Sequence, residues 1–293
     1  MDKHAETEPR LSIVIPTKRE AQCILPLLDR IKGGTLDEDI QVIFVDDSDD
    51  ETPDVITKAK EQFDFDIQLI NRPPDARRGG LGGAVVEGIQ AARAPWVVVM
   101  DADLQHPPEL IPEMLDKAID TQADAIICSR FLRRDGLINS KIPRTLISRS
   151  FTLLTRLSFP KQLFHISDPL SGYFLIRREA ISTKQLKARG YKILLEILVR
   201  HPSLRVAEIP FQIEERLAEK SKASSGEALQ FLSHLLSLRL RASAQFFQFL
   251  LVGASGLIVN SLLMAAFVEL LGLHYLLSAV LATQGSTLSL IHI

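Results

Sequence analysis

Two acids with one residue between them, Asp101 and Asp103, give the sequence its sharpest chemical signal. They follow an apolar run, and residues i and i+2 of an extended chain point to the same side, so both carboxylates can reach one cation across Ala102. Hard divalent cations prefer oxygen ligands, and Gln105 follows as a neutral one. A Mg²⁺ or Mn²⁺ ion held here would offset the negative charge that grows on a leaving nucleoside diphosphate. Because D-x-D is a common pattern, a pair of solvated loop acids is the alternative.

A glycine-rich run, RRGGLGGA at 77–84, is predicted to open a helix. Glycines such as Gly82 let backbone N–H groups approach an anion closely at the positive end of a helix. The rival interpretation is a dinucleotide-binding fingerprint. That fingerprint belongs to the first strand-to-helix turn, which here reads PTKRE without glycine, so we reject it.

Basic residues follow the acid pair along the chain. Arg130 ends the next apolar run, and Arg144 and Ser148 lie one turn apart on one face of a predicted helix. An arginine with a hydroxyl at i+4 can bind a phosphate, although exposed helix arginines are commonly solvated surface. Asp168 begins the turn DPLSGY, where it could cap a helix or orient a sugar hydroxyl or a base. The pattern does not choose among these roles.

Short β-branched apolar runs alternate with amphipathic stretches, which predicts an α/β fold with a mostly parallel, open sheet. Asp, Pro and Gly residues bound these runs, as is typical of strands buried on both faces. The predicted strands are 11–16, 41–47, 66–72, 96–103 and 123–130. The predicted helices are 20–31, 51–62, 80–92, 108–120, 143–158, 178–188 and 190–200.

Polar residues gather where three of these strands end. Pro16 and Thr17 end the first strand, Asp46 and Asp47 end the second, and the acid pair ends the fourth. Ligands of open α/β sheets bind at the carboxyl ends of the strands, so a ligand site is predicted at this edge. A single Asp at such a place is equally well a strand terminator or a helix cap.

Charge and cysteine content narrow the class of protein. A net charge of −2 lacks the polycationic surface of a nucleic-acid-binding protein, and 46% apolar residues indicate a globular chain. Cys23 and Cys128 lie far apart without metal-binding spacing, so reduced cytoplasmic thiols are expected. The polar segment 1–10 lacks the apolar core of a signal peptide, which also predicts a cytoplasmic domain.

The C-terminal region predicts contact with a membrane. Residues 246–271 run almost without charge, and about 20 apolar residues suffice to cross a bilayer core. The preceding stretch 227–241 is amphipathic and ends with Arg239 and Arg241. Such a helix is expected to lie in the membrane interface, and basic residues beside a span place the N-terminal domain on the cytoplasmic side.

Ordered motifs over residues 11–225 resemble those of a known family. They are IPTKRE, VDDSDDET, GGLGGA, VVMDADLQHPPEL, CSRF, PRTLISRS, SDPLSGYFLIRRE, GYKILLEIL and R-x-x-x-x-S-K. In this order they resemble the inverting family 2 glycosyltransferases, specifically polyprenyl-phosphate sugar synthases of the dolichol-phosphate mannose synthase type. The resemblance implies a GT-A-type nucleotide-sugar-binding sheet with flanking helices, followed by transmembrane helices.

The resemblance also implies a role for each motif residue. The metal ligands are Asp101, Asp103 and Gln105. The substrate-binding residues are Pro16, Thr17, Glu20, Asp46, Asp47, Gly82, Ala102, Arg144, Ser148 and Asp168. Within this set Arg144 and Ser148 join Arg130 in receiving a lipid phosphate. The catalytic residues are Asp103, Arg130, Arg216 and Lys222, the last two on a closing loop over the donor.

Some motifs depart from the pattern of relatives. Lys18-Arg19 stand where relatives often carry Tyr-Asn, which changes the expected nucleotide stacking, and Glu219-Lys220 replace Gly-Glu, which predicts a stiffer loop. The tail from Phe246 resembles the start of a GtrA-like membrane domain, with one full span and part of a second. The closing GSTLSLIHI predicts a truncated or foreign end, although a multi-pass membrane protein is expected in full length.

These observations predict four regions and one activity. The regions are a polar tail at 1–10, the transferase domain at 11–225, an amphipathic linker at 226–243 and a partial membrane domain at 244–293. The activity is metal-dependent transfer of a hexose, mannose first and glucose next, from GDP-mannose or UDP-glucose to a polyprenyl or dolichyl phosphate with inversion. A lipid phosphate is already anionic, so positioning and charge neutralisation suffice without a strong general base.

Two other functions stay open at this point. A family 2 transferase with a non-lipid saccharide acceptor would be active with soluble acceptors and indifferent to Arg144→Ala. A non-catalytic membrane scaffold would only bind the nucleotide sugar. Intact Asp101, Asp103, Arg216 and Lys222 argue against the scaffold, which has little use for a leaving-group metal and a closing basic loop.

Overall fold

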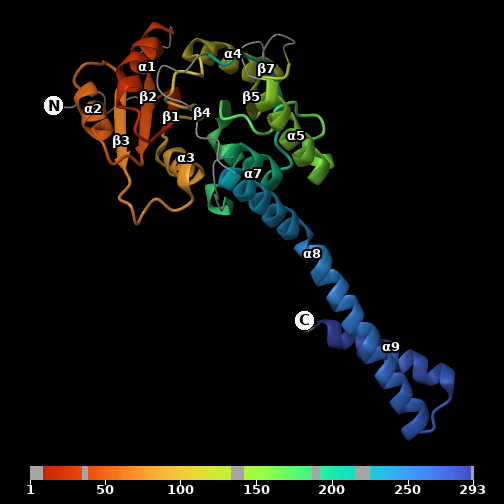
Figure 1. Ribbon diagram of the computed structural model, residues 1–293. Helices are drawn as coiled ribbons and strands as arrows, with labels where there is room; N and C mark the ends of the chain where they lie inside the picture. The colour runs from red at the N-terminus through yellow and green to blue at the C-terminus, as the bar shows by residue number, and fades with distance from the viewer. Residues whose placement is uncertain (1–8, 35–38, 133–141, 187–191, 215–224, 292–293) are drawn as a thin grey trace. The chain divides into compact units, whose positions relative to one another are not determined.

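A seven-stranded sheet forms the centre of the N-terminal unit, residues 1–235, in the computed structural model (Figure 1). The structure describes residues 9–34, 39–132, 142–186, 192–214 and 225–291. The strands are β1 (Leu11–Thr17), β2 (Ile40–Asp46), β3 (Asp66–Asn71), β4 (Trp96–Val99), β5 (Ala125–Ser129), β6 (Phe174–Arg177) and β7 (Val206–Pro210). Their order in the sheet is β3-β2-β1-β4-β6-β5-β7, and only β6 runs antiparallel to its neighbours.

Helices connect the parallel strands and cover them. They are α1 (Ala21–Gly33), α2 (Thr52–Ala59), α3 (Gly80–Ala91), α4 (Ile111–Thr121), α5 (Ile142–Ser158), α6 (Pro160–Leu163) and α7 (Ile193–Arg200), with 3₁₀ turns η1 (Pro108–Leu110), η2 (Arg178–Ala180) and η3 (Thr183–Gln185). Every residue of β1, β2 and β5 is buried, because such crossovers cover both faces of a parallel sheet. The mostly parallel α/β fold is therefore confirmed.

The predicted elements agree closely with the structure up to residue 92, and some of the later ones depart from it. The predicted strand 96–103 is too long, because β4 ends at Val99 and the acid pair lies in a loop. The short strands β6 and β7 were not predicted. The helix predicted at 178–188 is wrong over its described part, which forms η2 and η3. Ile181 is extended between them, and the Ser182 N–H donates to Nε2 of His201 at 2.9 Å instead of continuing a helix.

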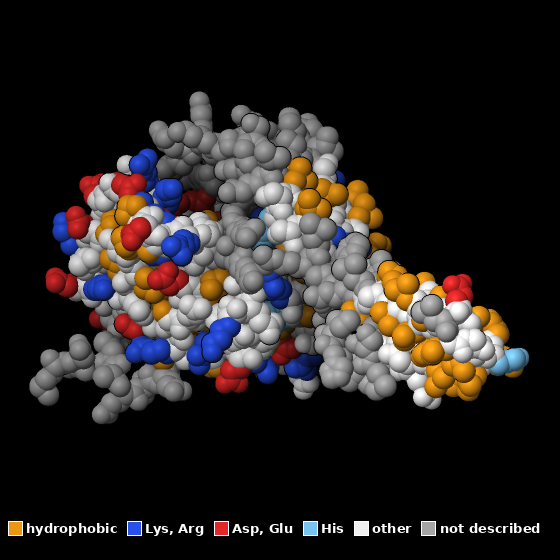
Figure 2. All heavy atoms as spheres, turned by 90° about the horizontal axis from the view of Figure 1, so that it is seen from below, with side chains coloured by type: hydrophobic (Ala, Val, Ile, Leu, Met, Phe, Trp, Pro, Cys, Tyr) orange, Lys and Arg blue, Asp and Glu red, His pale blue; other side chains and the backbone are white. Residues whose placement is uncertain are grey.

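The second unit, residues 236–293, is helical and apolar. The long helix α8 (Ser225–Ala265) runs into it and continues as a π-helical turn, η4 (Ala266–Leu270), before α9 (Tyr275–Ile291). Hydrophobic side chains make up much of its surface in the face that Figure 2 draws. Among the described residues one segment, Val252–Glu269, is long and apolar enough to cross a membrane, with a mean hydropathy of 1.6. It falls within the predicted span 246–271.

Candidate active site

A buried acid shapes the turn at the carboxyl end of β2. Asp46 is fully buried, and its Oδ1 accepts hydrogen bonds from the hydroxyls of Thr17 and Ser48, both at 2.6 Å. Its Oδ2 accepts the Ser48 N–H at 3.1 Å. The Asp47 N–H donates to the Thr17 carbonyl at 3.0 Å. Asp46 thus joins the ends of β1 and β2 and sets the backbone from which Asp47 projects.

Asp47 is paired with Arg72, the residue after β3. Arg72 donates from Nε at 2.7 Å and from Nη2 at 2.5 Å to the two carboxylate oxygens of Asp47. The same Nη2 donates to the Gly80 carbonyl at 3.0 Å, where α3 begins. The Arg72 side chain is 2% exposed and the Asp47 side chain 11% exposed. This pair joins β2, β3 and α3 and leaves the acid as its more solvent-accessible member.

The glycine-rich run opens α3, as predicted. Gly79 and Gly80 have φ angles of 79° and 57°, a backbone region that favours glycine. A Cβ atom on Gly83 would lie 2.1 Å from the Arg78 carbonyl oxygen and 3.1 Å from Nη1 of Arg72. The absence of a side chain at Gly83 therefore lets the first turn of α3 pack closely against Arg72, and Gly82 is buried in the same turn.

Glu20 lies at the start of α1, whose first turn carries Cys23. The Glu20 N–H donates to the Thr52 hydroxyl at 3.1 Å. Burial, followed by the charges of Glu20 and Asp103, raises the pKa of the Cys23 thiol in the first turn of α1.

Asp101 and Asp103 lie half-exposed in the loop after β4. The Asp101 N–H donates to Nδ1 of His106 at 2.9 Å, so this ring nitrogen is the acceptor. The His106 ring stacks on Tyr173 with centroids 5.0 Å apart, and the Tyr173 hydroxyl donates to the Pro107 carbonyl at 2.7 Å. Buried aromatic contacts therefore support this loop, while the Asp101 side chain remains 39% exposed.

Gln105 links the acid pair to the segment after β7. Its N–H donates to Oδ1 of Asp103 at 3.1 Å, and its Nε2 donates to the Glu214 carbonyl at 3.1 Å. The Glu214 carboxylate pairs with Arg30 at 2.7 Å, and Arg30 also pairs with Glu109 at 2.7 Å. The amide nitrogen of Gln105 is used by the protein, whereas a cation would use its amide oxygen.

The donor set fits a divalent cation that is shared with a ligand. Over the described part of the chain, no group of three or more His, Cys, Asp and Glu side chains could hold a metal ion. Mg²⁺ is commonly bound by one or two carboxylates together with substrate phosphates, and the half-exposed Asp101 and Asp103 side chains suit that arrangement. These residues are compatible with a catalytic cation rather than with a closed structural metal centre.

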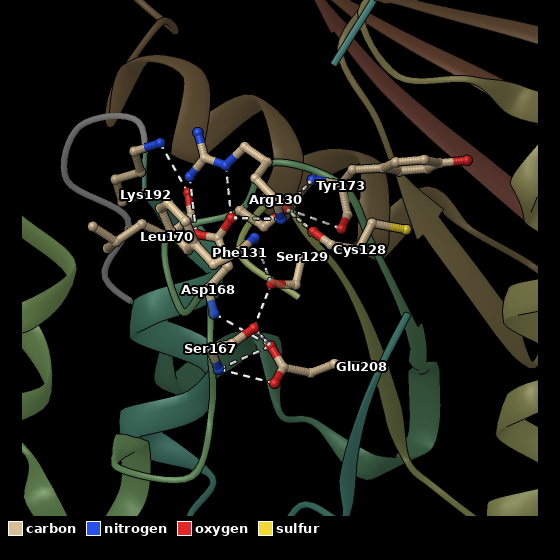
Figure 3. Close-up of polar contacts among 11 residues, drawn as sticks. Cys128, Ser129, Arg130, Phe131, Ser167, Asp168, Leu170, Tyr173, Lys192 and Glu208 are labelled. Atoms are coloured by element: carbon tan, nitrogen blue, oxygen red, sulfur yellow. Dashed lines mark hydrogen bonds and ion pairs between the residues drawn. The ribbon is translucent and has the colours of Figure 1, made fainter. Parts of the chain in front are cut away.

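Arg130 and Asp168 form a second bidentate pair, drawn in Figure 3. Arg130, directly after β5, donates from Nε at 2.6 Å and from Nη2 at 2.9 Å to the Asp168 carboxylate. The Asp168 side chain is 0% exposed and the Arg130 side chain 19% exposed. Burial alone would lower the pKa of the Arg130 guanidinium, but the charges of Asp168 and Asp101 raise it. Arg130 therefore keeps its positive charge beside Asp168.

The structure places the remaining predicted residues unevenly. Pro16 lies within β1, and Ala102 is fully buried between the two acids. Ser148 is half-buried on α5. The side chain of Arg144, the whole of Arg216 and the whole of Lys222 lie outside the described residues, so their roles stay predictions.

Three residues that shape the site were not predicted as functional: Arg72, His106 and Tyr173. Arg72 had a sequence signal as a residue of this edge, because it follows the third predicted strand as Asp46 and Asp47 follow the second. Its pairing with Asp47 had no such signal, because that pairing depends on the register of β2 with β3. His106 and Tyr173 had no signal beyond lying in motifs. Their contact depends on β6 lying beside β4, which the sequence pattern did not predict.

Comparison with known proteins identifies the family to which these motifs belong. The model of glycosyl transferase family 2 matches residues 12–183. The chain is 32% identical to a dolichol-phosphate mannosyltransferase from Pyrococcus furiosus, over 89% of this chain and 73% of the relative. A protein of the same name from Saccharomyces cerevisiae is 29% identical, over 78% of this chain and 86% of the relative.

Solved structures share the fold at lower identity. Glucosyl-3-phosphoglycerate synthase from Mycobacterium tuberculosis, in complex with Mn²⁺, uridine-diphosphate-glucose and phosphoglyceric acid, superposes with a TM-score of 0.60 at 19% identity. That match covers 79% of this chain and 80% of the other. A complex of the same enzyme with glycerol 3-phosphate gives a TM-score of 0.59 at 19% identity, covering 78% and 80%. At this identity the likeness establishes the fold alone.

Proposed function

The chain belongs to glycosyl transferase family 2, and on that basis we propose that it transfers mannose from a nucleotide sugar to dolichyl or another polyprenyl phosphate. The observation that carries the proposal is the proximity of opposite charges at one edge of the sheet. The half-exposed acid pair can receive a metal and a diphosphate. It adjoins the segment that holds Arg130, because a Cβ atom on Gly172, four residues after Asp168, would lie 3.4 Å from Oδ2 of Asp101. The choice of mannose and of a lipid phosphate acceptor is based on relatives that are named dolichol-phosphate mannosyltransferase.

The donor site is proposed at the ends of β1 and β2. GDP-mannose is the first candidate donor and UDP-glucose the second. Pro16, Thr17 and Glu20 would line the nucleotide pocket, and Asp47 would accept hydrogen bonds from the nucleotide. Asp46 would act through the turn that it holds, since its own carboxylate already accepts three hydrogen bonds. Gly82 would face the diphosphate from the start of α3.

A divalent cation, Mn²⁺ or Mg²⁺, is proposed as the cofactor. Asp101, Asp103 and the amide oxygen of Gln105 would hold it together with the donor diphosphate. When bound, such an ion stabilises the negative charge of the leaving nucleoside diphosphate. A synthase with the same fold binds Mn²⁺ in its solved structure, so Mn²⁺ is the first ion to test.

The acceptor phosphate is proposed to bind beside Arg130, with Arg144 and Ser148 from α5. One of its oxygens attacks C1 of the sugar from the face opposite the diphosphate. The new C1–O bond forms as the bond from C1 to the donor phosphate breaks, so the nucleoside diphosphate leaves and the configuration inverts. The attacking oxygen is already anionic, so positioning and charge neutralisation by Arg130, Arg216 and Lys222 take the place of a strong general base.

A membrane location follows from the lipid acceptor and from the apolar helix Val252–Glu269. We propose that residues 11–225 form a transferase domain on the cytoplasmic face, that 226–243 lie in the interface, and that 244–293 begin a multi-pass membrane domain. A protease-protection assay on sealed vesicles that contain the protein would check the side on which the transferase domain lies.

Transfer of radiolabelled sugar into the organic phase tests the proposal. The protein in detergent with dolichyl phosphate is given labelled GDP-mannose or, separately, UDP-glucose, with Mn²⁺, with Mg²⁺ or with EDTA. We expect metal-dependent label from GDP-mannose in the lipid fraction. Label in a soluble saccharide acceptor instead, with none in the lipid, would contradict the proposal. Asp103→Ala should abolish transfer, and full activity in that variant would remove the metal assignment.

A further inference from the structure

One carboxylate on β7, Glu208, organises the turn that carries Asp168 (Figure 3). Its Oε1 accepts the Ser167 hydroxyl at 2.7 Å and the Asp168 N–H at 3.2 Å. The Ser167 N–H is shared between Oε1 at 3.0 Å and Oε2 at 2.9 Å. Two successive backbone N–H groups and a hydroxyl thus converge on one anion, as they do in backbone nests. No step of the proposed transfer uses Glu208 directly.

The same turn is tied to the end of β5. The hydroxyls of Ser129 and Ser167 share a hydrogen bond, and the Ser129 hydroxyl also accepts the Phe131 N–H at 3.2 Å. Arg130 lies between Ser129 and Phe131. In the strand register Glu208 lies opposite Ile127, two residues before Ser129. Both members of the Arg130–Asp168 pair are therefore anchored to the junction of β5 and β7.

Asp168 leaves one edge of the Arg130 guanidinium for a ligand. The pair uses Nε and Nη2, and in Figure 3 the remaining nitrogen, Nη1, points away from Asp168. The direction of this edge depends on where the buried Asp168 carboxylate sits, because a bidentate pair fixes the guanidinium plane. A shift of the Ser167–Asp168 turn would rotate the edge, and displacements near 1 Å are enough to reduce activity about 100-fold.

We propose that Glu208 is a positioning residue for the acceptor phosphate, because it fixes the turn from which Asp168 directs Arg130. This inference rests on the proposed function, which assigns the acceptor phosphate to Arg130. Hydrogen bonds to a charged carboxylate are stronger than those to a neutral group, so the charge of Glu208 matters as well as its shape.

Glu208→Gln tests the role of that charge. Glutamine keeps the length of the side chain and the Oε1 acceptor, but places an NH₂ donor opposite the Ser167 N–H. We expect the KM for dolichyl phosphate to rise roughly 10-fold, the size of effect seen when the partner behind a binding residue is lost. The KM for GDP-mannose should stay within about twofold of the wild-type value, since the donor site lies on β1 and β2.

Asp124→Asn is the matched control. Asp124 directly precedes β5, and its carboxylate accepts the N–H of Arg205, which directly precedes β7, at 3.1 Å. It therefore bridges the same two strands as Glu208, but at their N-terminal ends. Both KM values should be unchanged in this variant. An equal rise in the acceptor KM there would mean that any weakening of the β5–β7 junction suffices, and would overturn the proposal.

A double-mutant cycle separates positioning from general loss of structure. If Glu208 acts through Asp168, Glu208→Gln should have little further effect on the acceptor KM in an Asp168→Asn background. If the two substitutions instead raised the acceptor KM independently, so that their fold-changes multiplied in the double variant, the proposal would be overturned. A donor KM that rises as much as the acceptor KM in Glu208→Gln would do the same.

Amide hydrogen exchange distinguishes failure of this inference from failure of the proposed function. If the wild-type chain does not label dolichyl phosphate, the function is wrong, but the hold of Glu208 on the turn can still be measured. Glu208→Gln should speed exchange at Ser167, at Asp168 and at Arg130, whose N–H donates to Oδ2 of Asp168 at 3.4 Å. Wild-type protection at all three amides would overturn the inference whatever the activity.

Discussion

Two arginine–carboxylate pairs lie at the same edge of the sheet with opposite exposure. In the first pair Arg72 is 2% exposed and its partner Asp47 is 11% exposed. In the second pair the order is reversed, because Asp168 is 0% exposed and Arg130 is 19% exposed. Both pairs are bidentate through Nε and Nη2. The member nearer to solvent is therefore an acid in one pair and a base in the other.

Because the exposed member differs between the two pairs, the same type of contact can serve two different ligands. An ionised carboxylate only accepts hydrogen bonds, so Asp47 suits hydroxyl and N–H groups of a nucleotide. A guanidinium only donates them, so Arg130 suits a phosphate. In each pair the deeper member fixes the outer one. In the proposed function, Arg72–Asp47 would serve the donor and Arg130–Asp168 the acceptor.

The largest expected effect is on Arg130. Arg130→Ala removes a charged donor from the proposed acceptor site, and loss of one such group typically lowers activity about 100- to 1,000-fold. We expect a loss of this size in kcat/KM for dolichyl phosphate, measured at saturating donor. Arg205→Ala removes an exposed arginine that pairs with Asp124 and should leave activity unchanged. Equal losses in the two variants would break the comparison.

Arg72→Ala should act first on stability. Its loss would leave the Asp47 carboxylate unpaired and mostly buried, and breaking a buried ion pair costs about 3 to 5 kcal/mol. Urea unfolding should show a loss near the lower end of that range, since Asp47 keeps some contact with solvent. Arg72→Ala combined with Asp47→Asn should lose less than Arg72→Ala alone. A larger loss in the double variant would contradict the pairing.

Gly83→Ala is expected to disturb the first pair without touching its charges. The added methyl group would meet the Arg78 carbonyl and Nη1 of Arg72, and overpacking of this kind costs about 1 to 3 kcal/mol. The KM for GDP-mannose should also rise, because Arg72 orients Asp47 in the proposed donor site. Gly33→Ala is the matched control, because nothing lies within 4 Å of the position of its Cβ. Similar losses in both variants would show that glycine matters at these sites for another reason.

The smallest effect is expected at Arg30, a partly exposed arginine that pairs with both Glu109 and Glu214. Its hydrogen bond to Glu109 lowers the pKa of that carboxyl below its ordinary value of 4.5. A depressed folded-state pKa adds stability above pH 4.5, and that stability is lost as pH falls through the folded-state pKa. Arg30→Ala should therefore cost less than about 1 kcal/mol at pH 7, and less still at pH 3. Urea unfolding at both values checks the sign, and a loss that grows on acidification would contradict it.

The first half of the fold could be read from the sequence, because buried parallel strands form long apolar runs. β1, β2 and β3 begin and end within one residue of their predicted limits. β6 contains a short apolar run, Tyr173–Ile176, that was not recognised as a strand, whereas β7 (VAEIP) lacks such a run. The place of both strands in the sheet is decided by pairing with β4 and β5, which lie distant in sequence, so local pattern could not predict that place.

The candidate site was likewise predictable only in part. Asp46, Asp47 and the acid pair could be predicted, because each follows a recognisable strand at the edge where ligands bind. The partners that hold them could not. Arg72 meets Asp47 only through the register of β2 with β3, and Asp168 meets Arg130 only because β6 lies beside β5. Residue type gave the chemistry, whereas long-range pairing decided which member of each pair faces the ligand.

Two-substrate kinetics on Asp47→Asn and Asp168→Asn, measured side by side, would separate the donor pair from the acceptor pair. Both substitutions keep the side-chain shape and remove one charge from a bidentate pair. We expect Asp47→Asn to raise the KM for GDP-mannose and to leave the KM for dolichyl phosphate unchanged, and we expect Asp168→Asn to do the reverse. If both variants raised the same KM, or if each raised both, the assignment of the two arginine pairs to donor and acceptor would be wrong.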